Sequence, residues 1–153
     1  MTTIRVQTHD FDAGAELAAL SAGRTDIGGL GCFVGTVRHD PAAPLAALVL
    51  EHYPGMTERA MQAVAAQAQA RFPLLGCTLV HRVGRLPPGA NIVLVATASA
   101  HRQAALDATG FLIDWLKTAA PFWKKEIFVD GAERWVEARA ADTAAADAWN
   151  AQP

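Results

Sequence analysis

The segment CTLVHRVGRLPPGANIVLVATA, residues 77–98, decides the fold of this chain. Residues 77–83 and 92–98 are rich in apolar and β-branched side chains, a composition that favours strands. The intervening loop, residues 84–91, carries the triplet PPG and has no helical pattern. Two strands joined without a helix pair as an antiparallel hairpin, because a parallel pair needs a long crossover. The hairpin therefore favours an α+β fold over an alternating α/β fold.

The rest of the chain extends this pattern in both directions. Asp12 is positioned to cap one helix and Pro73 to end another. The order β-α-β-β-α-β-β-α-β-β-α predicts a single α+β domain, residues 1–153, with a mainly antiparallel or mixed sheet and flanking helices. The remaining strands are expected at residues 4–8, 32–38, 45–53, 126–129 and 135–136, and helices at residues 13–22, 57–71, 102–118 and, in the alanine-rich tail, about 138–149.

Composition excludes several classes of protein. Hydrophobic residues make up 52% of the 153 positions and charged residues 18%, which indicates a packed globular protein. The formal net charge of −2 gives no reason to expect nucleic acid or an acidic membrane as a partner. Apolar runs are too short for a membrane span, and the N-terminus is not a signal peptide. Any anion site must therefore be a local cluster of cations.

The cysteines and histidines do not predict a metal or cofactor site. Cys32 and Cys77 lie far apart in strand-like surroundings, so we expect buried free thiols and a cytoplasmic location, and no thiolate nucleophile. The five histidines show no metal-ligand spacing, and His52 and His81 are expected to be strand residues with satisfied hydrogen bonds. The glycines near residue 30 lack the dinucleotide-binding spacing. No cofactor is expected.

All three lysines fall within nine residues, as Lys117, Lys124 and Lys125, whereas the other ten basic positions are arginine. Arginine keeps its charge permanently, whereas the proton of a lysine amine can be tuned by its surroundings. Two interpretations stay open here: a surface turn that happens to carry lysines, or a site that requires an amine. Pro121 should end the preceding helix near residue 118 and place Lys117 in its last turn. Side chains of adjacent residues often point opposite ways, so only one of the later two lysines should face Lys117.

The start of the same helix carries His101 and Arg102. A cation is unfavourable at a helix N-terminus unless an anion lies nearby. Arg102 is therefore either solvated at small cost or part of an anion pocket with His101 and the backbone amides. The helix spans about 24 Å at 1.5 Å per residue, so His101 cannot reach Lys117 within one subunit. Either the sites are separate or a symmetric partner joins them.

Six stretches together resemble the large, catalytic subunit of molybdopterin synthase: FVGTVR (33–38), LEHYPGM (50–56), HRVG (81–84), SAHR (99–102), LKT through APFWKKE (116–126) and WVEA (135–138). The resemblance implies an α/β hammerhead-type fold and a homodimer at the core of a heterotetramer. A small ubiquitin-like subunit with a C-terminal Gly-Gly thiocarboxylate would bind at each end. The implied reaction inserts two sulfurs from that thiocarboxylate into cyclic pyranopterin monophosphate, which forms molybdopterin.

The resemblance also implies roles for particular residues. Lys117 and Lys124 would be catalytic. Near the dimer interface, a pterin-phosphate pocket would be lined by Arg38, His101 and Arg102, with Lys125 and Glu126 flanking, Thr36 and Val37 preceding Arg38, and Arg139 assisting.

The residues agree with that chemistry. A thiocarboxylate and a phosphate are both anions, so cations must bring them together. Arginine forks suit phosphate, and an amine beside other cations can exchange a proton. Two other classes remain alternatives: a non-catalytic module that docks a ubiquitin-like Gly-Gly tail, and an anion-binding regulator that binds ligand without turnover.

Overall fold

A computed structural model describes residues 1–136 and 140–152. The chain forms an α+β fold, which confirms the predicted class. It has two four-stranded sheets where the sequence predicted one sheet. The elements run β1 (Thr2–Gln7), α1 (Ala13–Ser21), β2 (Gly29–Thr36), β3 (Leu45–His52), α2 (Met56–Arg71), β4 (Leu74–Arg82), β5 (Gly84–Leu86), β6 (Asn91–Ser99), α3 (Arg102–Thr118), β7 (Phe122–Phe128), β8 (Glu133–Val136) and α4 (Ala140–Asn150).

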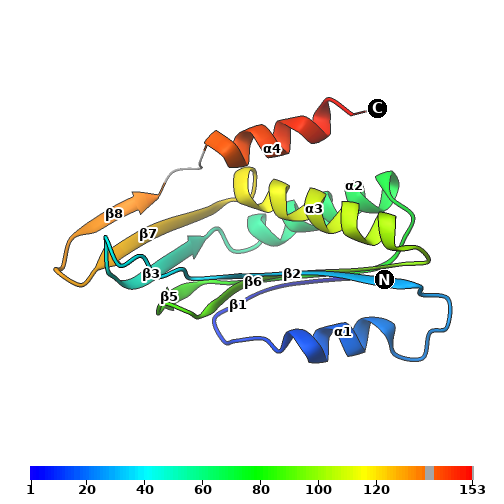
Figure 1. Cartoon of the computed structure of the whole chain (residues 1–153), viewed down its shortest axis with the longest axis horizontal. Helices are drawn as coiled ribbons and strands as arrows, with labels where there is room; N and C mark the ends of the chain where they lie inside the picture. Colours follow the sequence, from blue (N-terminus) through cyan, green and yellow to red (C-terminus); the bar gives the residue numbers. More distant parts are fainter. Residues whose placement is uncertain (137–139, 153) are drawn as a thin grey trace.

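The first sheet contains the predicted hairpin. Its strand order is β1-β4-β6-β2, and β4 pairs antiparallel with β6 in a register that places Cys77 opposite Thr97. Only β1 runs parallel to its neighbour, β4, so this sheet is mixed. Helix α1 covers one face, whereas α2 and α3 cover the other (Figure 1). The largest hydrophobic cluster fills the space between the sheet and α2 and α3.

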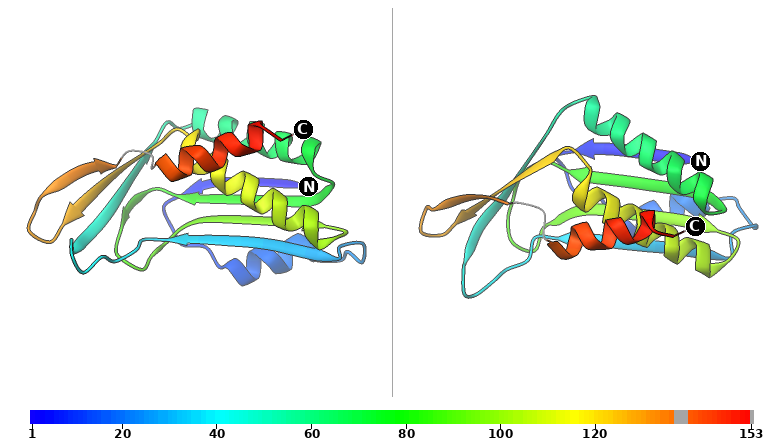
Figure 2. Two further views of the ribbon diagram at one scale, coloured as in Figure 1. Left: turned by 45° about the horizontal axis from the view of Figure 1, so that its top comes forward. Right: turned by 90° about the horizontal axis from the view of Figure 1, so that it is seen from above.

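The second sheet has the order β5-β3-β7-β8 and is entirely antiparallel. It extends beyond one end of the helical layer, as both views in Figure 2 show. The prediction that residues 84–91 form only a loop was wrong, because Gly84–Leu86 forms β5 and pairs with β3. Gly84 has a φ of +94°, a conformation that glycine adopts readily, where the chain leaves the first sheet for the second.

Helix α3 packs closely on the strands beneath it. On its inner face, the Thr109 hydroxyl lies 3.0 Å from the Thr97 hydroxyl of β6, and both share the Ala105 carbonyl as acceptor at 2.8 Å. Gly31 of β2 leaves room for this buried group: a Cβ there would lie 2.4 Å from the Thr109 hydroxyl oxygen. Leu106 of the same helix, in contrast, is 60% exposed.

The tail helix lies across α3, on the side away from the sheet (Figure 1). The Trp149 indole donates a hydrogen bond to Asp114 of α3 at 2.8 Å, and its ring packs edge-on against Phe72 and Phe111. Arg71 lies 5.3 Å from the centre of the Trp149 ring. The predicted tail helix is confirmed over Ala140–Asn150, and its first two predicted residues, 138 and 139, lie outside the described residues.

The predicted cap of α1 is confirmed, whereas the predicted burial of both cysteines is not. The Asp12 carboxylate accepts a hydrogen bond from the Ala15 amide at 3.0 Å and so caps α1. Cys77 is buried, but Cys32 is exposed, because it lies on β2 at the edge of the first sheet. The prediction of two buried thiols is therefore wrong for Cys32. No helix within residues 1–136 and 140–152 is long and apolar enough to cross a membrane.

Candidate active site

Two of the three lysines line one small cavity between the sheets. Helix α3 ends at Thr118 as predicted, so Lys117 occupies its last turn. Pro121 separates the helix from β7, which carries Lys124. Lys117 and Lys124 contribute to the wall of a cavity of about 40 Å³, together with Thr36, His81, Gly35, Ile92, Val93, Ile113 and Leu116.

Lys125 belongs to a different surface. Its amine lies 3.4 Å from the Glu133 carboxylate on β8 and 5.4 Å from the centre of the Trp135 ring. Residues 124 and 125 alternate along β7, so their side chains lie on opposite faces of the strand. The prediction that only one of the two lysines faces Lys117 is confirmed. The predicted strand at residues 126–129 begins earlier, at Phe122, which is why this alternation applies to the lysines.

The surroundings of Lys124 disfavour its charged form. Burial in the cavity lowers the pKa of this amine, and the nearby charge of Lys117 lowers it further. The Asp142 carboxylate on α4 acts in the opposite direction and raises it. An amine with a lowered pKa is a better proton donor and acceptor near neutral pH than an ordinary lysine.

His81 is a member of this cavity that the sequence did not indicate as a site residue. Its Nδ1 lies 2.8 Å from the Arg82 carbonyl oxygen, so this nitrogen carries the proton and donates. Its ring stacks on Phe122 with centres 3.7 Å apart. Burial lowers the pKa of His81 to about 3, and the charges of Lys124 and Lys117 add to this effect. His81 is therefore a neutral imidazole at working pH.

The prediction that both strand histidines have satisfied hydrogen bonds holds for Nδ1 of His81 and fails for His52. The Nδ1 atom of His52 is buried without a hydrogen-bond partner among the described residues. Its ring lies 6.3 Å from that of Phe122, centre to centre, so Phe122 contacts both imidazoles.

The neutral state of His81 predicts acid sensitivity of the fold. Its pKa is about 3 in the folded chain and 6.5 without the fold's influence. Between these values the unfolded chain binds a proton that the folded chain does not, so stability falls as pH falls through this window. We expect this residue to contribute a slope of up to about 1.4 kcal/mol per pH unit to the free energy of unfolding. Urea unfolding between pH 7 and 4 measures it. An equal slope in a His81→Asn variant would contradict the assignment.

Arg38 and Glu126 line a second, larger cavity of about 700 Å³ beside β8. Glu126 is paired there with Arg134 at 2.8 Å. Val37 is buried in a hydrophobic cluster with residues of β3 and β5, and its backbone amide and carbonyl are hydrogen-bonded to Ala90 and Gly89. This cavity holds cationic and anionic groups together, in contrast to the lysine cavity.

His101 and Arg102 lie at the far end of α3 and are exposed. His101 is the N-cap residue and makes no side-chain capping hydrogen bond. About 24 Å of helix separates these residues from Lys117, so one chain does not bring the two groups together. Arg139 lies outside the described residues. Within the described part of the chain, no three His, Cys, Asp or Glu side chains are grouped to hold a metal ion.

The fold and the cavity define an α+β protein in which two lysine amines line one cavity. The family model described as MoaE protein matches residues 6–119. A molybdopterin synthase catalytic subunit from Mesorhizobium japonicum is 55% identical over 148 residues, which cover 96% of this chain and 92% of that protein. The corresponding subunit from Rhizobium meliloti is 56% identical, with 96% and 95% covered.

A solved structure agrees. The molybdopterin biosynthesis MoaE protein from Burkholderia ambifaria has a TM-score of 0.83 at 55% identity, with 98% of this chain and 99% of that chain covered. The chain therefore belongs to the MoaE protein family and is an enzyme subunit of molybdenum-cofactor biosynthesis.

Proposed function

We propose that this chain catalyses sulfur transfer from the C-terminal thiocarboxylate of a small ubiquitin-like subunit to cyclic pyranopterin monophosphate, which yields molybdopterin. The observation that carries the proposal is the pairing of Lys117 and Lys124 in one cavity. The names of the relatives, catalytic subunits of molybdopterin synthase, support it. Both cysteines are free, which fits the reducing cytoplasm as the site of the reaction.

The lysine cavity suits the electrostatics of this reaction. The sulfur donor and the phosphate-bearing acceptor are both anions, and two cationic side chains offset their mutual repulsion. Loss of the acyl group builds negative charge on oxygen, which Lys117 stabilises. Lys124, with its lowered pKa, exchanges the proton that the reaction requires.

The phosphate site is completed by a second copy of the chain. His101 and Arg102 are exposed at the end of α3 remote from the lysines, and Arg38 lines a separate cavity. A twofold dimer that places the start of one α3 near the end of the other would join these groups. Arg38 and Arg102 would then bind phosphate through paired N–H donors, with His101, Thr36, Lys125, Glu126 and Arg139 around the pterin.

The direct test is incubation of the chain with a thiocarboxylated small subunit and the cyclic pterin, followed by mass detection of the product. Each thiocarboxylate group supplies one sulfur, so the proposal expects a product that carries two added sulfurs when two or more small subunits are supplied per pterin. Binding of the cyclic pterin alone should also be measurable, because a module that only docks a protein tail has no use for it. A folded chain that binds the small subunit but neither binds nor sulfurates the pterin would refute the proposal.

The cysteines should be dispensable for this chemistry. Burial raises the pKa of the Cys77 thiol to about 12 and also raises that of Cys32, so neither is a ready thiolate. We expect the double variant Cys32→Ala, Cys77→Ala to retain sulfur transfer within about threefold, although Cys77→Ala should cost roughly 1 kcal/mol of stability through lost packing. Loss of transfer by a variant that unfolds normally would show that a cysteine thiol of the chain takes part in the reaction.

A further inference from the structure

His81 has a place in the lysine cavity that the proposed chemistry leaves unexplained. The residue comes from β4 of the first sheet, whereas Lys124 comes from β7 of the second and Lys117 from α3. All three side chains line the same cavity of about 40 Å³. His81 is only 4% exposed, and a buried polar ring is unfavourable unless its nitrogens have partners. A leucine or phenylalanine would fill the same space without that cost.

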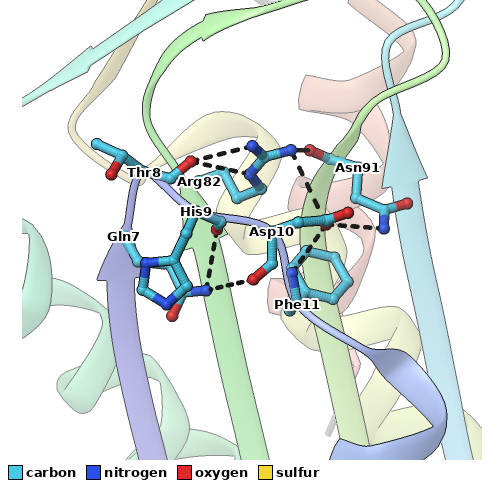
Figure 3. A network of polar contacts seen from close by, with 7 residues as sticks. All are labelled: Gln7, Thr8, His9, Asp10, Phe11, Arg82 and Asn91. Carbon is cyan, nitrogen blue, oxygen red and sulfur yellow. Dashed lines mark hydrogen bonds and ion pairs between the residues drawn. The ribbon is translucent and has the colours of Figure 1, made fainter.

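Contacts at Nδ1 and on one face of the ring fix the orientation of the His81 imidazole. Its Nδ1–H donates to the carbonyl of Arg82, and one face is covered by Phe122. The Arg82 side chain in turn donates to the Thr8 carbonyl at 3.0 and 3.2 Å and to the Asn91 carbonyl at 3.0 Å (Figure 3). The Arg82 side chain is therefore held by carbonyls next to both neighbouring strands, β1 and β6.

Asp10 closes this network from the loop before α1. Its carboxylate accepts from the Asn91 amide at 3.0 Å and lies 3.9 Å from Arg82 (Figure 3). The side-chain amide of Gln7 donates hydrogen bonds to the carbonyls of His9 and Asp10 in the same loop. The Arg82 carbonyl can only accept, and its contact with Nδ1 therefore selects the Nδ1–H tautomer of His81. In that tautomer Nε2 carries a lone pair and accepts a hydrogen bond.

We propose that His81 is a positioning residue for the sulfur-transfer reaction: its Nε2 accepts a hydrogen bond from the amine of Lys124 and aims that amine into the cavity. Within the described residues, the only hydrogen bond of the ring is the one to Arg82, so Nε2 is free for this role. The amine donates and the imidazole accepts, which leaves the remaining N–H groups or the lone pair of Lys124 directed at the reactants. The inference rests on the function proposed above.

The charged and titratable groups around His81 keep it in the accepting state. Cations on two elements face it, Lys124 from β7 and Lys117 from α3, and both oppose protonation of the ring. His52 from β3 acts in the same direction. The Asp142 carboxylate of α4 acts on Lys124 in the opposite direction. A neutral acceptor can hold the amine by a hydrogen bond, whereas the charge of a carboxylate in the same place would also raise the pKa of Lys124.

Two variants of His81 test the roles of Nδ1 and Nε2 separately. In His81→Asn the side-chain amide can replace Nδ1 as donor to the Arg82 carbonyl, but it is too short to replace Nε2. In His81→Gln the amide oxygen reaches the position of Nε2, and the donor to Arg82 is lost. Both variants lose the stack on Phe122, so they form a matched pair. Sulfur transfer is measured for both in the assembled enzyme with the small subunit, across pH 6 to 10, alongside thermal unfolding.

We expect the Asn variant to lose roughly tenfold or more in kcat, the effect of one hydrogen bond to a charged group, and the Gln variant to recover a large part of that loss. The acid side of the pH profile should move to lower pH in the Asn variant, because removal of an acceptor favours the neutral amine of Lys124. Equal losses in the two folded variants, or a greater loss in the Gln variant, would overturn the proposal.

A second measurement does not depend on turnover. Nitrogen-15 NMR of the wild-type chain distinguishes a protonated Nδ1 from a protonated Nε2, and we expect the Nδ1–H tautomer throughout pH 5 to 9. An imidazolium or an Nε2–H tautomer would overturn the role of His81 even if sulfur transfer is confirmed. Conversely, a wild-type enzyme without sulfurated product would remove the function while leaving the tautomer result intact.

Discussion

Replacing Lys117 with arginine should lower the rate of sulfur transfer by about a hundredfold or more. The variant keeps the positive charge at the end of α3, where a cation also suits the helix dipole, so the fold should be preserved. It loses the compact amine that stabilises the negative charge on oxygen, and the larger, planar guanidinium does not fit easily in a cavity of about 40 Å³. Loss of one group aimed at developing negative charge typically costs roughly a hundredfold to a thousandfold in rate.

The measurement is single-turnover formation of sulfurated pterin with a thiocarboxylated partner. Arg59→Lys, an exchange on the exposed side of α2, controls for the effect of swapping one cation for the other. Thermal unfolding of Lys117→Arg within a few degrees of the parent would show that the fold is intact. Near-normal turnover would mean that a positive charge alone suffices at this position, which would contradict an amine-specific role of Lys117.

Changing Gly31 to alanine should destabilise the fold by about 3 kcal/mol or more, the range of severe overpacking. The added Cβ would lie 2.4 Å from the Thr109 hydroxyl, 2.6 Å from the Ala105 carbonyl and 2.7 Å from the Thr97 hydroxyl. Relief requires α3 to move away from β2 and β6, which also separates the buried threonine pair. Since Lys117 is carried by α3, its position in the cavity would change as well.

Gly14→Ala is the matched control, because a Cβ at Gly14 would meet its nearest neighbour, the Asp12 carboxylate, at an ordinary 3.4 Å. Alanine is the better helix former, so this variant should be neutral or more stable by up to about 1 kcal/mol. Urea unfolding of both variants decides the matter. If Gly31→Ala unfolded at the same urea concentration as the parent, the close approach of β2 and α3 described above would be incorrect.

Local signals in the sequence were sufficient for most of the fold. Pro121 predicts the end of α3 because proline removes a donor and clashes with the preceding turn. The hairpin of β4 and β6 follows from two apolar strands without a helix between them. Strand β5 could not be predicted in this way, because three residues of a loop rich in proline and glycine become a strand only by pairing with β3.

The candidate site was predictable where neighbouring residues decide which way a side chain points, and it was not predictable where contacts between distant elements decide it. The expectation that adjacent residues point opposite ways correctly separates Lys124 from Lys125, although the strand that carries them was predicted to begin only at residue 126. His81 was not predicted, since its role depends on a cavity formed by both sheets and by α3. Exposure was also hard to infer: nothing near Cys32 in the sequence shows that its strand lies at a sheet edge.

Helix α3 carries the amine Lys117 at one end and the pair His101 and Arg102 at the other, on a frame of 17 residues. The length of α3 therefore sets the distance between these two groups. Deleting or inserting a single residue in its middle would turn one end by about 100° against the other and shift it by about 1.5 Å. Such a helix can exchange many of its side chains during evolution, but it cannot tolerate a change in their number.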